Sequence, residues 1–292
     1  MTTSRRDFLC ASVAALTPLA FSRVVFAQSG SQAASGMKLG LVSYNWGKDW
    51  DLPTTIKNCT DTGFSGVELR TTHKHGVEIA LSAQERKEVR KRFEDSAVEF
   101  VGPGSACDYH SPDPEVLKKN IEETKAFIKL SHDCGGTGVK VRPNGLPKEV
   151  PVEKTIEQIG LALKELAVFA DDYGQELRLE VHGPATSELP VIHQIMQIAE
   201  HPRARVCWNC NGTDLKGDGL EANFKLVADR IATVHIHDLR KNNYPWQELF
   251  PLLKGINFSG WTLLEEGNNP EDTISAMREN REIWNGLVAK TP

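Results

Sequence analysis

The stretch that decides the fold is Leu177-Arg-Leu-Glu180-Val-His182, which alternates apolar and ionisable residues and carries reactive groups near its end. Three later apolar segments end in a similar way, on Asn209, His235 and Glu265. These four polar residues are 29, 26 and 30 positions apart (180 to 209, 209 to 235, 235 to 265). One strand–helix unit takes roughly 30 residues, and the functional groups of a (β/α)8 barrel collect at the C-terminal ends of its strands. The spacing therefore predicts two carboxylates, an amide and an imidazole around one barrel mouth, which is the outline of a divalent-cation site.

The rest of the chain supplies four more candidate strands, with helical segments between them. Ser82-Ala-Gln-Glu85 is a capping box, and Asp113-Pro114 places a capping side chain before a proline at a first helical position. Alternating strands and helices indicate a parallel sheet, and eight units close a barrel. We therefore predict an α/β fold, a single-domain (β/α)8 TIM barrel, over residues 37–289. The expected strands are 38–42, 66–70, 98–101, 138–142, 177–182, 204–209, 231–237 and 262–265.

Several expected strands alternate instead of being continuously apolar, as strands buried on both faces usually are. Their apolar residues must face the helices, so their polar residues must point into the barrel. Burying ionisable groups without partners costs several kcal/mol each. We expect structural ion pairs deep in the barrel, such as Glu68 with Arg70 or Arg178 with a neighbour, and a solvated metal-binding pocket at the mouth.

The N-terminal segment has the pattern of an export signal. Arg5-Arg6 precedes an apolar run over 9–21, and Val25-Phe26-Ala27 is a small-residue cleavage pattern. We predict a twin-arginine signal peptide over 1–27, a flexible leader over 28–36 and a periplasmic or extracellular location. The alternative is a frayed N-terminal helix. No later stretch reaches the roughly 20 apolar residues of a transmembrane helix.

Charge and cysteine content exclude some classes of function. The formal net charge is −5, and removing residues 1–27, which carry three arginines and one aspartate, leaves −7. An acidic chain is a poor match for nucleic acid or an anionic membrane. Five cysteines remain after residue 27, without paired spacing, so we expect no disulfide framework. Cys207 and Cys210 form a CxxC, but no second pair completes a zinc site.

Four motifs together resemble the xylose isomerase-like TIM-barrel superfamily, which contains sugar phosphate isomerases and epimerases as well as endonuclease IV. The resemblance covers residues 37–287 and depends on the order, spacing and strand position of the motifs. The motifs are LEVHG at 179–183, VCWN at 206–209, VHIHD at 234–238 and GWTLLE at 260–265. The resemblance implies one divalent ion, commonly manganese, held by Glu180, Asn209, His235 and Glu265.

Asn209 departs from the family pattern, which usually has Asp at this ligand position. An amide oxygen still binds a hard cation, but it brings no charge. The ligand charge is then −2 rather than −3, which lowers the expected affinity for a cation and makes a bound substrate oxyanion better tolerated. We expect Mn²⁺ to be favoured, with Mg²⁺, Co²⁺ or Zn²⁺ as other candidates; the alternative is a site that has lost its metal. Glu266 competes with Glu265 as a ligand, but strand alternation and the count from Gly260-Trp261 favour Glu265.

The resemblance also implies a mechanism. Moving a hydrogen between neighbouring carbons of a hydroxy-carbonyl sugar passes through an enediolate, whose charge a chelated cation stabilises. Glu180 and Glu265 would act as acid and base. His182 and Lys140 could polarise a substrate oxygen, and Arg142 or Arg240 could bind a carboxylate or phosphate. The remaining candidate substrate-binding residues are His73, His75, His110 and His237.

The prediction is therefore an isomerase or epimerase of a small sugar, sugar acid or keto-acid, which could form a homo-oligomer. Its main alternative is a metal-free or non-catalytic barrel that binds carbohydrate, and a sugar lyase or dehydratase is another. The loop histidines also suggest a trinuclear nuclease like endonuclease IV. Against it, the position three after Asn209 is Gly212, where that family needs His, and the chain is acidic and has an export pattern.

Overall fold

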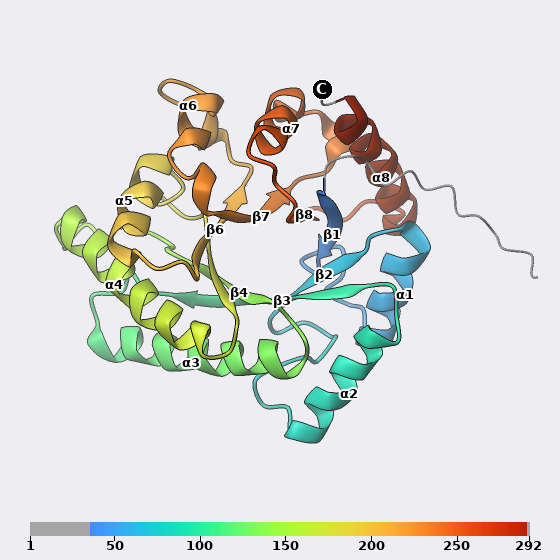
Figure 1. The fold of residues 1–292 in the computed structure, drawn as a ribbon, viewed down its shortest axis with the longest axis horizontal. Coiled ribbons are helices and arrows are strands. Elements are labelled where there is room, and N and C mark those ends of the chain that lie inside the picture. Colours follow the sequence, from blue (N-terminus) through green and yellow to red (C-terminus); the bar gives the residue numbers. More distant parts are fainter. Residues whose placement is uncertain (1–35, 291–292) are drawn as a thin grey trace, which may run out of the picture. The chain divides into compact units, whose positions relative to one another are not determined.

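The computed structural model describes residues 36–290, which form a closed barrel of eight parallel strands. The strands pair in chain order, and β8 closes the barrel against β1 (Figure 1). The predicted signal peptide and nearly all of the predicted leader lie outside the described residues. The strands are β1 (Lys38–Val42), β2 (Gly66–Arg70), β3 (Glu99–Asp108), β4 (Gly138–Arg142), β5 (Glu176–Glu180), β6 (Ala204–Asn209), β7 (Ile231–Ile236) and β8 (Trp261–Leu264).

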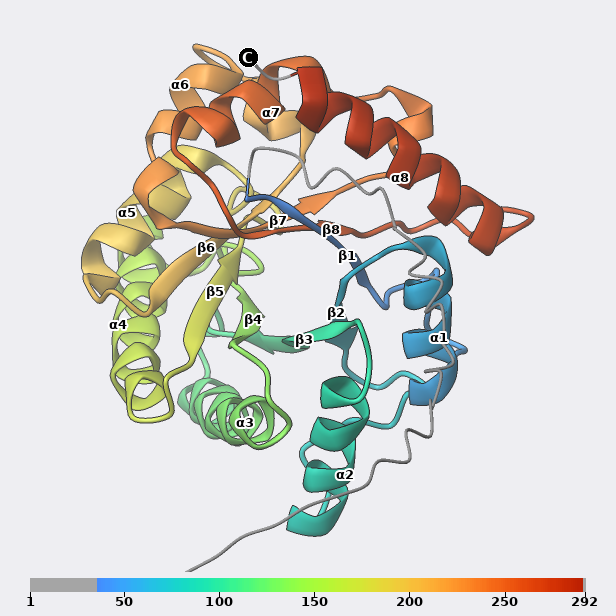
Figure 2. The ribbon, with the colours of Figure 1, turned by 45° about the vertical axis from the view of Figure 1, so that its right-hand side comes forward.

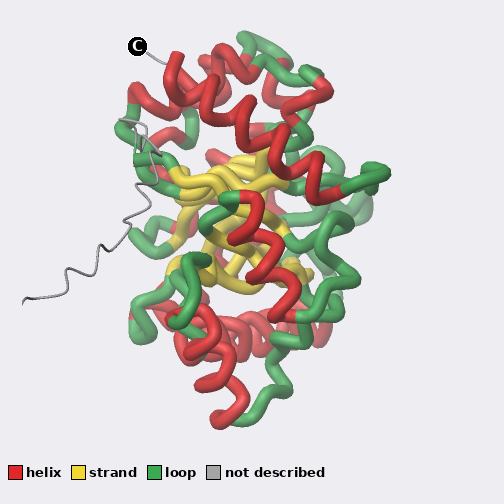
Figure 3. Tube along the Cα trace, turned by 90° about the vertical axis from the view of Figure 1, so that its right-hand side faces the viewer, coloured by secondary structure: helices red, strands yellow, loops and turns green. Residues whose placement is uncertain are grey.

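An α-helix follows each strand, and the helices surround the barrel (Figures 2 and 3). The α-helices are α1 (Leu52–Thr62), α2 (Ala83–Glu94), α3 (Pro114–Asp133), α4 (Val152–Asp171), α5 (Leu189–Ala199), α6 (Leu220–Lys225), α7 (Trp246–Gly255) and α8 (Thr273–Lys290). Short 3-10 helices lie at η1 (Gly212–Leu215), η2 (Ala228–Arg230) and η3 (Leu239–Lys241). None of the described helices is long and apolar enough to cross a membrane. The (β/α)8 TIM barrel predicted from the sequence is thus confirmed.

Local sequence explains where several helices begin. The Ser82 side chain accepts a hydrogen bond from the Glu85 backbone, and the Glu85 side chain accepts one from the Ser82 backbone, so the predicted capping box is present at α2. Asp113 caps α3 by accepting from the Glu115 backbone, with Pro114 at the first position. Such side chains satisfy backbone N–H groups that have no partner inside the helix. Both predicted helix starts are confirmed.

Strand boundaries differ from the predicted ones mainly at β3. The expected strand over 98–101 continues to Asp108, because the glycine-rich segment from Gly102 remains paired with β2 and β4. Glycine and proline are unfavourable in strands, so residue preferences did not indicate this extension. At the other strands the observed ends lie within two residues of the expected ones, which is the usual scatter of strand and helix assignments.

The core has two parts, on the two sides of the sheet. Outward-facing residues such as Val67, Val141, Leu179 and Val234 are fully buried in the large cluster between strands and helices. A second, small cluster consists of Val42, Val101, Trp261 and Leu263. Trp261 and Leu263 lie against Gly66 and Gly40 of neighbouring strands, where a Cβ atom would clash with them. This apolar cluster fills part of the barrel interior, and the polar residues of the expected site lie toward the C-terminal strand ends.

The cysteines belong to the buried interior. All five cysteines of the described residues are free thiols, in line with the prediction that no disulfide framework exists. Burial raises the pKa of both Cys207 and Cys210, which keeps these thiols protonated.

Candidate active site

The four expected ligand residues lie at the C-terminal ends of four consecutive strands. Glu180 and Asn209 end β5 and β6, His235 lies next to the end of β7, and Glu265 follows β8. Asn209 and His235 are register partners. One ligand atom each from Glu180, His235 and Glu265 lies within 4.8 Å of the others. Adjacent parallel strands therefore bring these side chains together, as their spacing predicted.

Direct contacts link these groups to one another and to Lys140. Asn209 Nδ2 donates to Glu180 Oε1 at 3.0 Å, and Lys140 Nζ donates to Glu180 Oε2 at 2.7 Å. His235 Nδ1 lies 3.2 Å from Glu265 Oε2 and 3.6 Å from Glu180 Oε1. Lys140, Glu180 and His235 are almost completely buried. Their charges therefore interact with little screening by solvent.

Burial and charge act in opposite directions on this cluster. Burial disfavours the charged form of Glu180, but Lys140 and His235 outweigh it and hold the pKa of that carboxyl well below its usual range. Burial also opposes ionisation of Glu265, yet His235 lowers the pKa of this carboxyl. The pKa of Lys140 is raised against the effect of burial by Glu180 and Glu68. The site is therefore a cluster of ionised carboxylates balanced by cationic groups.

Several polar atoms of this cluster have no well-oriented hydrogen-bond partner among the described residues. They are Asn209 Oδ1, both ring nitrogens of His235 and Glu68 Oε1. A buried polar atom without a partner costs about 1–3 kcal/mol. Amide oxygen, imidazole nitrogen and carboxylate oxygens are all ligands of divalent ions such as Mn²⁺. The residues present therefore fit a divalent cation, with the positive charge of Lys140 beside them.

Glu68 on β2 lies next to this cluster, which corrects the expected ion pair with Arg70. Its Oε1 is 3.4 Å from His235 Nε2, on the side of the ring opposite to Glu265, and the carboxylate is buried. Gly104 makes room for it, because a Cβ atom there would lie 2.8 Å from Glu68 Oε1. The one signal for this placement in the sequence is the inward position of Glu68 in its alternating strand. The expected ion pair of Arg178 with a neighbour is present, since its guanidinium lies 3.0 Å from Glu176 Oε2.

His182 and Arg142 lie on the wall of the site beside Lys140 and Glu180. His182 follows β5, and Glu180, Arg142 and Lys140 are all close enough to affect its charge. Burial lowers the pKa of His182, which favours the neutral imidazole. His182 Nδ1 and Arg142 Nε are buried without a partner in the described chain, while Arg142 Nη2 donates to the Ala106 carbonyl at 3.1 Å. Both side chains keep unused hydrogen-bonding capacity at the mouth.

The three loop histidines differ in how far their ring nitrogens are already used. His75 Nδ1 accepts from the Val77 backbone and its Nε2 lies 2.8 Å from the Arg70 carbonyl, which favours a structural role. His73 Nδ1 lies 2.6 Å from the Ser43 carbonyl, so only its other nitrogen is available. His110 Nδ1 lies 3.1 Å from Asp108 Oδ1. The substrate-binding role predicted for these residues stays a prediction.

His237 holds the strand ends together. Its Nδ1 lies 3.0 Å from the Glu265 carbonyl and its Nε2 lies 2.8 Å from the Cys210 carbonyl. The ring thus bridges the segments after β6 and β8 and fixes the backbone that carries Glu265. This geometry favours a positioning role for His237, and leaves the predicted contact with substrate untested.

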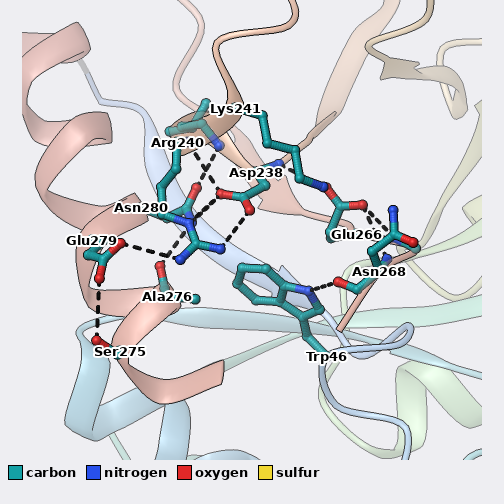
Figure 4. Close-up of polar contacts among 12 residues, drawn as sticks. Trp46, Asp238, Arg240, Lys241, Glu266, Asn268, Ser275, Ala276, Glu279 and Asn280 are labelled. Atoms are coloured by element: carbon teal, nitrogen blue, oxygen red, sulfur yellow. Dashed lines mark hydrogen bonds and ion pairs between the residues drawn. The ribbon is translucent and has the colours of Figure 1, made fainter. Parts of the chain in front are cut away.

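A network on the rim engages Arg240 and Glu266 (Figure 4). Arg240 Nη2 lies 2.7 Å from Asp238 Oδ2, and Arg240 Nη1 lies 3.3 Å from Glu279 Oε2. Glu266 accepts from Lys241 at 2.8 Å and from the backbone of Gly267. Glu266 therefore ties loops together, while Glu265 faces His235, in agreement with the count along β8.

The fold and the site agree with one known family. The family model described as "Xylose isomerase-like TIM barrel" matches residues 56–285, well over half of the 292 residues. The chain therefore belongs to this family.

Three solved structures illustrate the likeness. An L-ribulose 3-epimerase superposes with a TM-score of 0.74 at 18% identity, over 87% of this chain and 95% of that chain. The 3-keto-D-glucoside 4-epimerase YcjR from E. coli gives 0.73 at 14% identity, over 86% and 99%. The IOLI protein with a binding zinc atom gives 0.74 at 16% identity, over 88% and 99%. Identities this low establish a shared fold, and a shared fold does not by itself establish a shared activity.

Proposed function

We propose that this protein is a divalent-metal-dependent isomerase or epimerase of a small sugar, sugar acid or keto-acid, acting through an enediolate. The observation that carries the proposal is the grouping of the Glu180 and Glu265 carboxylates around His235, with ligand atoms within 4.8 Å of one another. The likeness to an L-ribulose 3-epimerase and to a 3-keto-D-glucoside 4-epimerase supports the same class of reaction.

Each residue of the cluster has a candidate role in this reaction. Glu180 and Glu265 are both ionised, so either is a candidate base that removes a proton beside a carbonyl and, once protonated, returns it to the neighbouring carbon. Return of a proton to the other face requires that the second glutamate first takes up a proton from water. Lys140 holds Glu180 in place through Oε2 and keeps positive charge beside it. The neutral imidazole of His182 is the third candidate catalytic group, because it can donate a hydrogen bond to a substrate oxygen.

The four candidate metal ligands are Glu180, Asn209, His235 and Glu265. A divalent ion bound there would act as a Lewis acid on negative charge that develops on substrate oxygens. Mn²⁺ is favoured by the three oxygen ligands, and Mg²⁺, Co²⁺ or Zn²⁺ are alternatives. The zinc atom bound by the IOLI protein supports a metal site in this fold.

The main alternative is a metal-free barrel that binds carbohydrate. One observation favours it: the Lys140 ammonium lies 2.7 Å from Glu180 Oε2 and already supplies a positive charge where a cation would bind. Asn209 also has one negative charge less than an aspartate. Metal analysis of the purified protein separates the two proposals.

Proton transfer is tested by hydrogen exchange. Manganese-loaded protein is incubated in deuterated water with a panel of ketoses, aldoses and sugar acids, and deuterium at carbon is followed by NMR. We expect incorporation into substrate and product, and a loss of turnover by a factor of roughly 10²–10⁴ in Glu265→Gln and in Glu180→Gln. Glu266→Gln is the matched control, because Glu266 bonds to loops, and should keep turnover.

Two outcomes would overturn this mechanism. Full turnover without deuterium incorporation would indicate a hydride shift in which neither glutamate is a base. Incorporation that survives in both Glu180→Gln and Glu265→Gln would remove these residues from the proton transfer. Circular dichroism of each variant checks that it folds.

A further inference from the structure

The mouth carries polar nitrogen atoms for which the described chain supplies no hydrogen-bond partner. Arg142 Nη2 donates to the Ala106 carbonyl at 3.1 Å, but its Nε is buried without a partner. His182 Nδ1 is buried without a partner as well. Leaving such groups unsatisfied is unfavourable, so a bound ligand or an ordered water molecule has to complete them.

The strand register places Arg142 next to the ionised cluster, on the side of the C-terminal strand ends. Lys140 and Arg142 are two residues apart on β4 and so share its inner face. Lys140 reaches Glu180, whereas Arg142 lies one step closer to the C-terminal end of the strand. The register partner of Arg142 is Asp108, whose carboxylate lies 3.1 Å from Asn144 Nδ2 and 3.1 Å from His110 Nδ1. Within residues 36–290, no carboxylate forms an ion pair with Arg142.

Arg240, the other arginine predicted to bind an anion, already has carboxylate partners. Arg240 is paired with Asp238 at 2.7 Å and with Glu279 at 3.3 Å (Figure 4). Its guanidinium also lies over the Trp46 ring, 5.8 Å from the centroid. Arg142 and Arg240 are both predicted to bind an anion, and of these two Arg142 has a buried donor that no described residue satisfies.

We infer that Arg142 and His182 form a carboxylate-binding subsite, and that the substrate is a sugar acid or keto-acid rather than a neutral sugar. A guanidinium binds a carboxylate through two parallel N–H donors, a geometry that an ammonium cannot provide. The inference rests on the proposed function, which places the reacting carbons of the substrate beside Glu180 and Glu265, and it narrows the class of substrate.

The test compares acids with neutral alcohols of the same length. Manganese-loaded protein is titrated calorimetrically with erythronate, xylonate and gluconate, and with the matched polyols erythritol, xylitol and glucitol. We expect at least one acid to bind about 10-fold or more tightly than its polyol, because a charge-assisted hydrogen bond is roughly twice as strong as a neutral one. In Arg142→Gln the acid should bind no better than the polyol, while affinity for the polyol and for Mn²⁺ stays unchanged.

Two further variants sharpen the result. Arg142→Lys keeps the positive charge but loses the two parallel N–H donors, and should show an intermediate preference for the acid over the polyol. Arg90→Gln removes an arginine from the exposed surface of α2, where it pairs with Glu94 at 2.9 Å, and should keep the full preference. Thermal unfolding of each variant establishes that it is folded.

The proposed subsite and the proposed function fail under different outcomes. Equal binding of acids and polyols, no binding of any acid, or a full preference in Arg142→Gln overturns the subsite. Turnover of neutral ketoses without a preference for acids would keep the proposed function and overturn the subsite. A protein that binds no metal and turns over no substrate, but binds an acid in a way that is lost in Arg142→Gln, would keep the subsite and overturn the proposed function.

Discussion

At the residue scale, the site depends on which hydrogen-bond and ion-pair partners each buried polar side chain has. Glu180 is engaged on both oxygens, by Asn209 and by Lys140. His235 has a carboxylate on each side of its ring, Glu265 and Glu68. The second carboxylate matters because metal-binding histidines usually donate their other ring N–H to a carboxylate or carbonyl group.

Glu68→Gln should weaken metal binding without removing a ligand. The amide keeps the size that fits against Gly104, but it no longer offers a charged acceptor to His235 Nε2. We expect the affinity for Mn²⁺ to fall by a factor of about 10–100, measured by calorimetric titration of metal-free protein. Glu94→Gln makes the same change on the exposed surface of α2 and is the control. Unchanged affinity in Glu68→Gln would remove it from the metal site.

Asn209→Asp should lower the stability of the metal-free protein and raise the stability of the metal-loaded protein. Without metal, the substitution removes the Nδ2 donor and places a carboxylate next to Glu180 Oε1, so the free energy of unfolding should fall by about 1–3 kcal/mol. With Mn²⁺ the restored charge should tighten binding and raise the thermal midpoint above that of wild type. Asn257→Asp, in an exposed turn, makes the same charge change away from the mouth. Weaker metal binding in Asn209→Asp would contradict the assignment of this residue as a ligand.

At the element scale, the segment after β6 is held by a buried carboxyl. Asp214 in η1 accepts from the Tyr244 hydroxyl at 2.8 Å and from the Asn211 backbone at 2.8 Å. Burial raises the pKa of Asp214 to about 7, against the effect of these two hydrogen bonds. Between its ordinary pKa of 3.8 and about 7, the folded protein therefore holds a proton that the unfolded chain releases.

This shift predicts a pH dependence of stability. The stabilising contribution of protonated Asp214 is complete below about pH 4 and is lost as the pH rises toward 7 and above. Asp214→Asn stays neutral and can accept the same hydrogen bonds, so its stability relative to wild type should increase from about pH 5 to about pH 8. Urea unfolding at both pH values measures this difference. A difference that does not change with pH would show that Asp214 titrates normally.

Regular strand spacing made the four candidate ligands predictable from the sequence. Glu180, Asn209, His235 and Glu265 could be placed together because barrel strands recur at a regular interval and side chains alternate along them. The partner of Glu68 could not be predicted, since it depends on the register between β2 and strands far along the chain. The sequence also could not distinguish Arg142 from Arg240, because the pairing of each arginine depends on side chains that loops bring near it.

At the scale of the whole molecule, the barrel is a packed scaffold that carries the candidate site at the C-terminal ends of its strands. The apolar cluster of Val42, Val101, Trp261 and Leu263 occupies part of the interior, and the ionised residues gather at the C-terminal strand ends. This separation keeps the proposed chemistry next to the βα loops, where substrate can enter.

We also propose that the protein is exported by the twin-arginine route, to the periplasm or the cell exterior. Arg5 and Arg6 precede the apolar run that supports this proposal. Replacing both by lysine should leave uncleaved precursor in the cytoplasm, detected by fractionation and immunoblotting of the tagged full-length chain. The pair Arg90 and Arg92, which is exposed on α2, is replaced in the same way as the control. Unchanged processing in the Arg5, Arg6 double variant would contradict the proposed route.

The central claim is that Glu180, Asn209, His235 and Glu265 hold a divalent ion. The most direct measurement is calorimetric titration of chelator-treated, metal-free protein with Mn²⁺. We predict about one ion per chain in wild type and none in His235→Ala, with circular dichroism showing that the variant is folded. Wild-type protein that binds no ion, or His235→Ala that binds one as tightly as wild type, would contradict the claim.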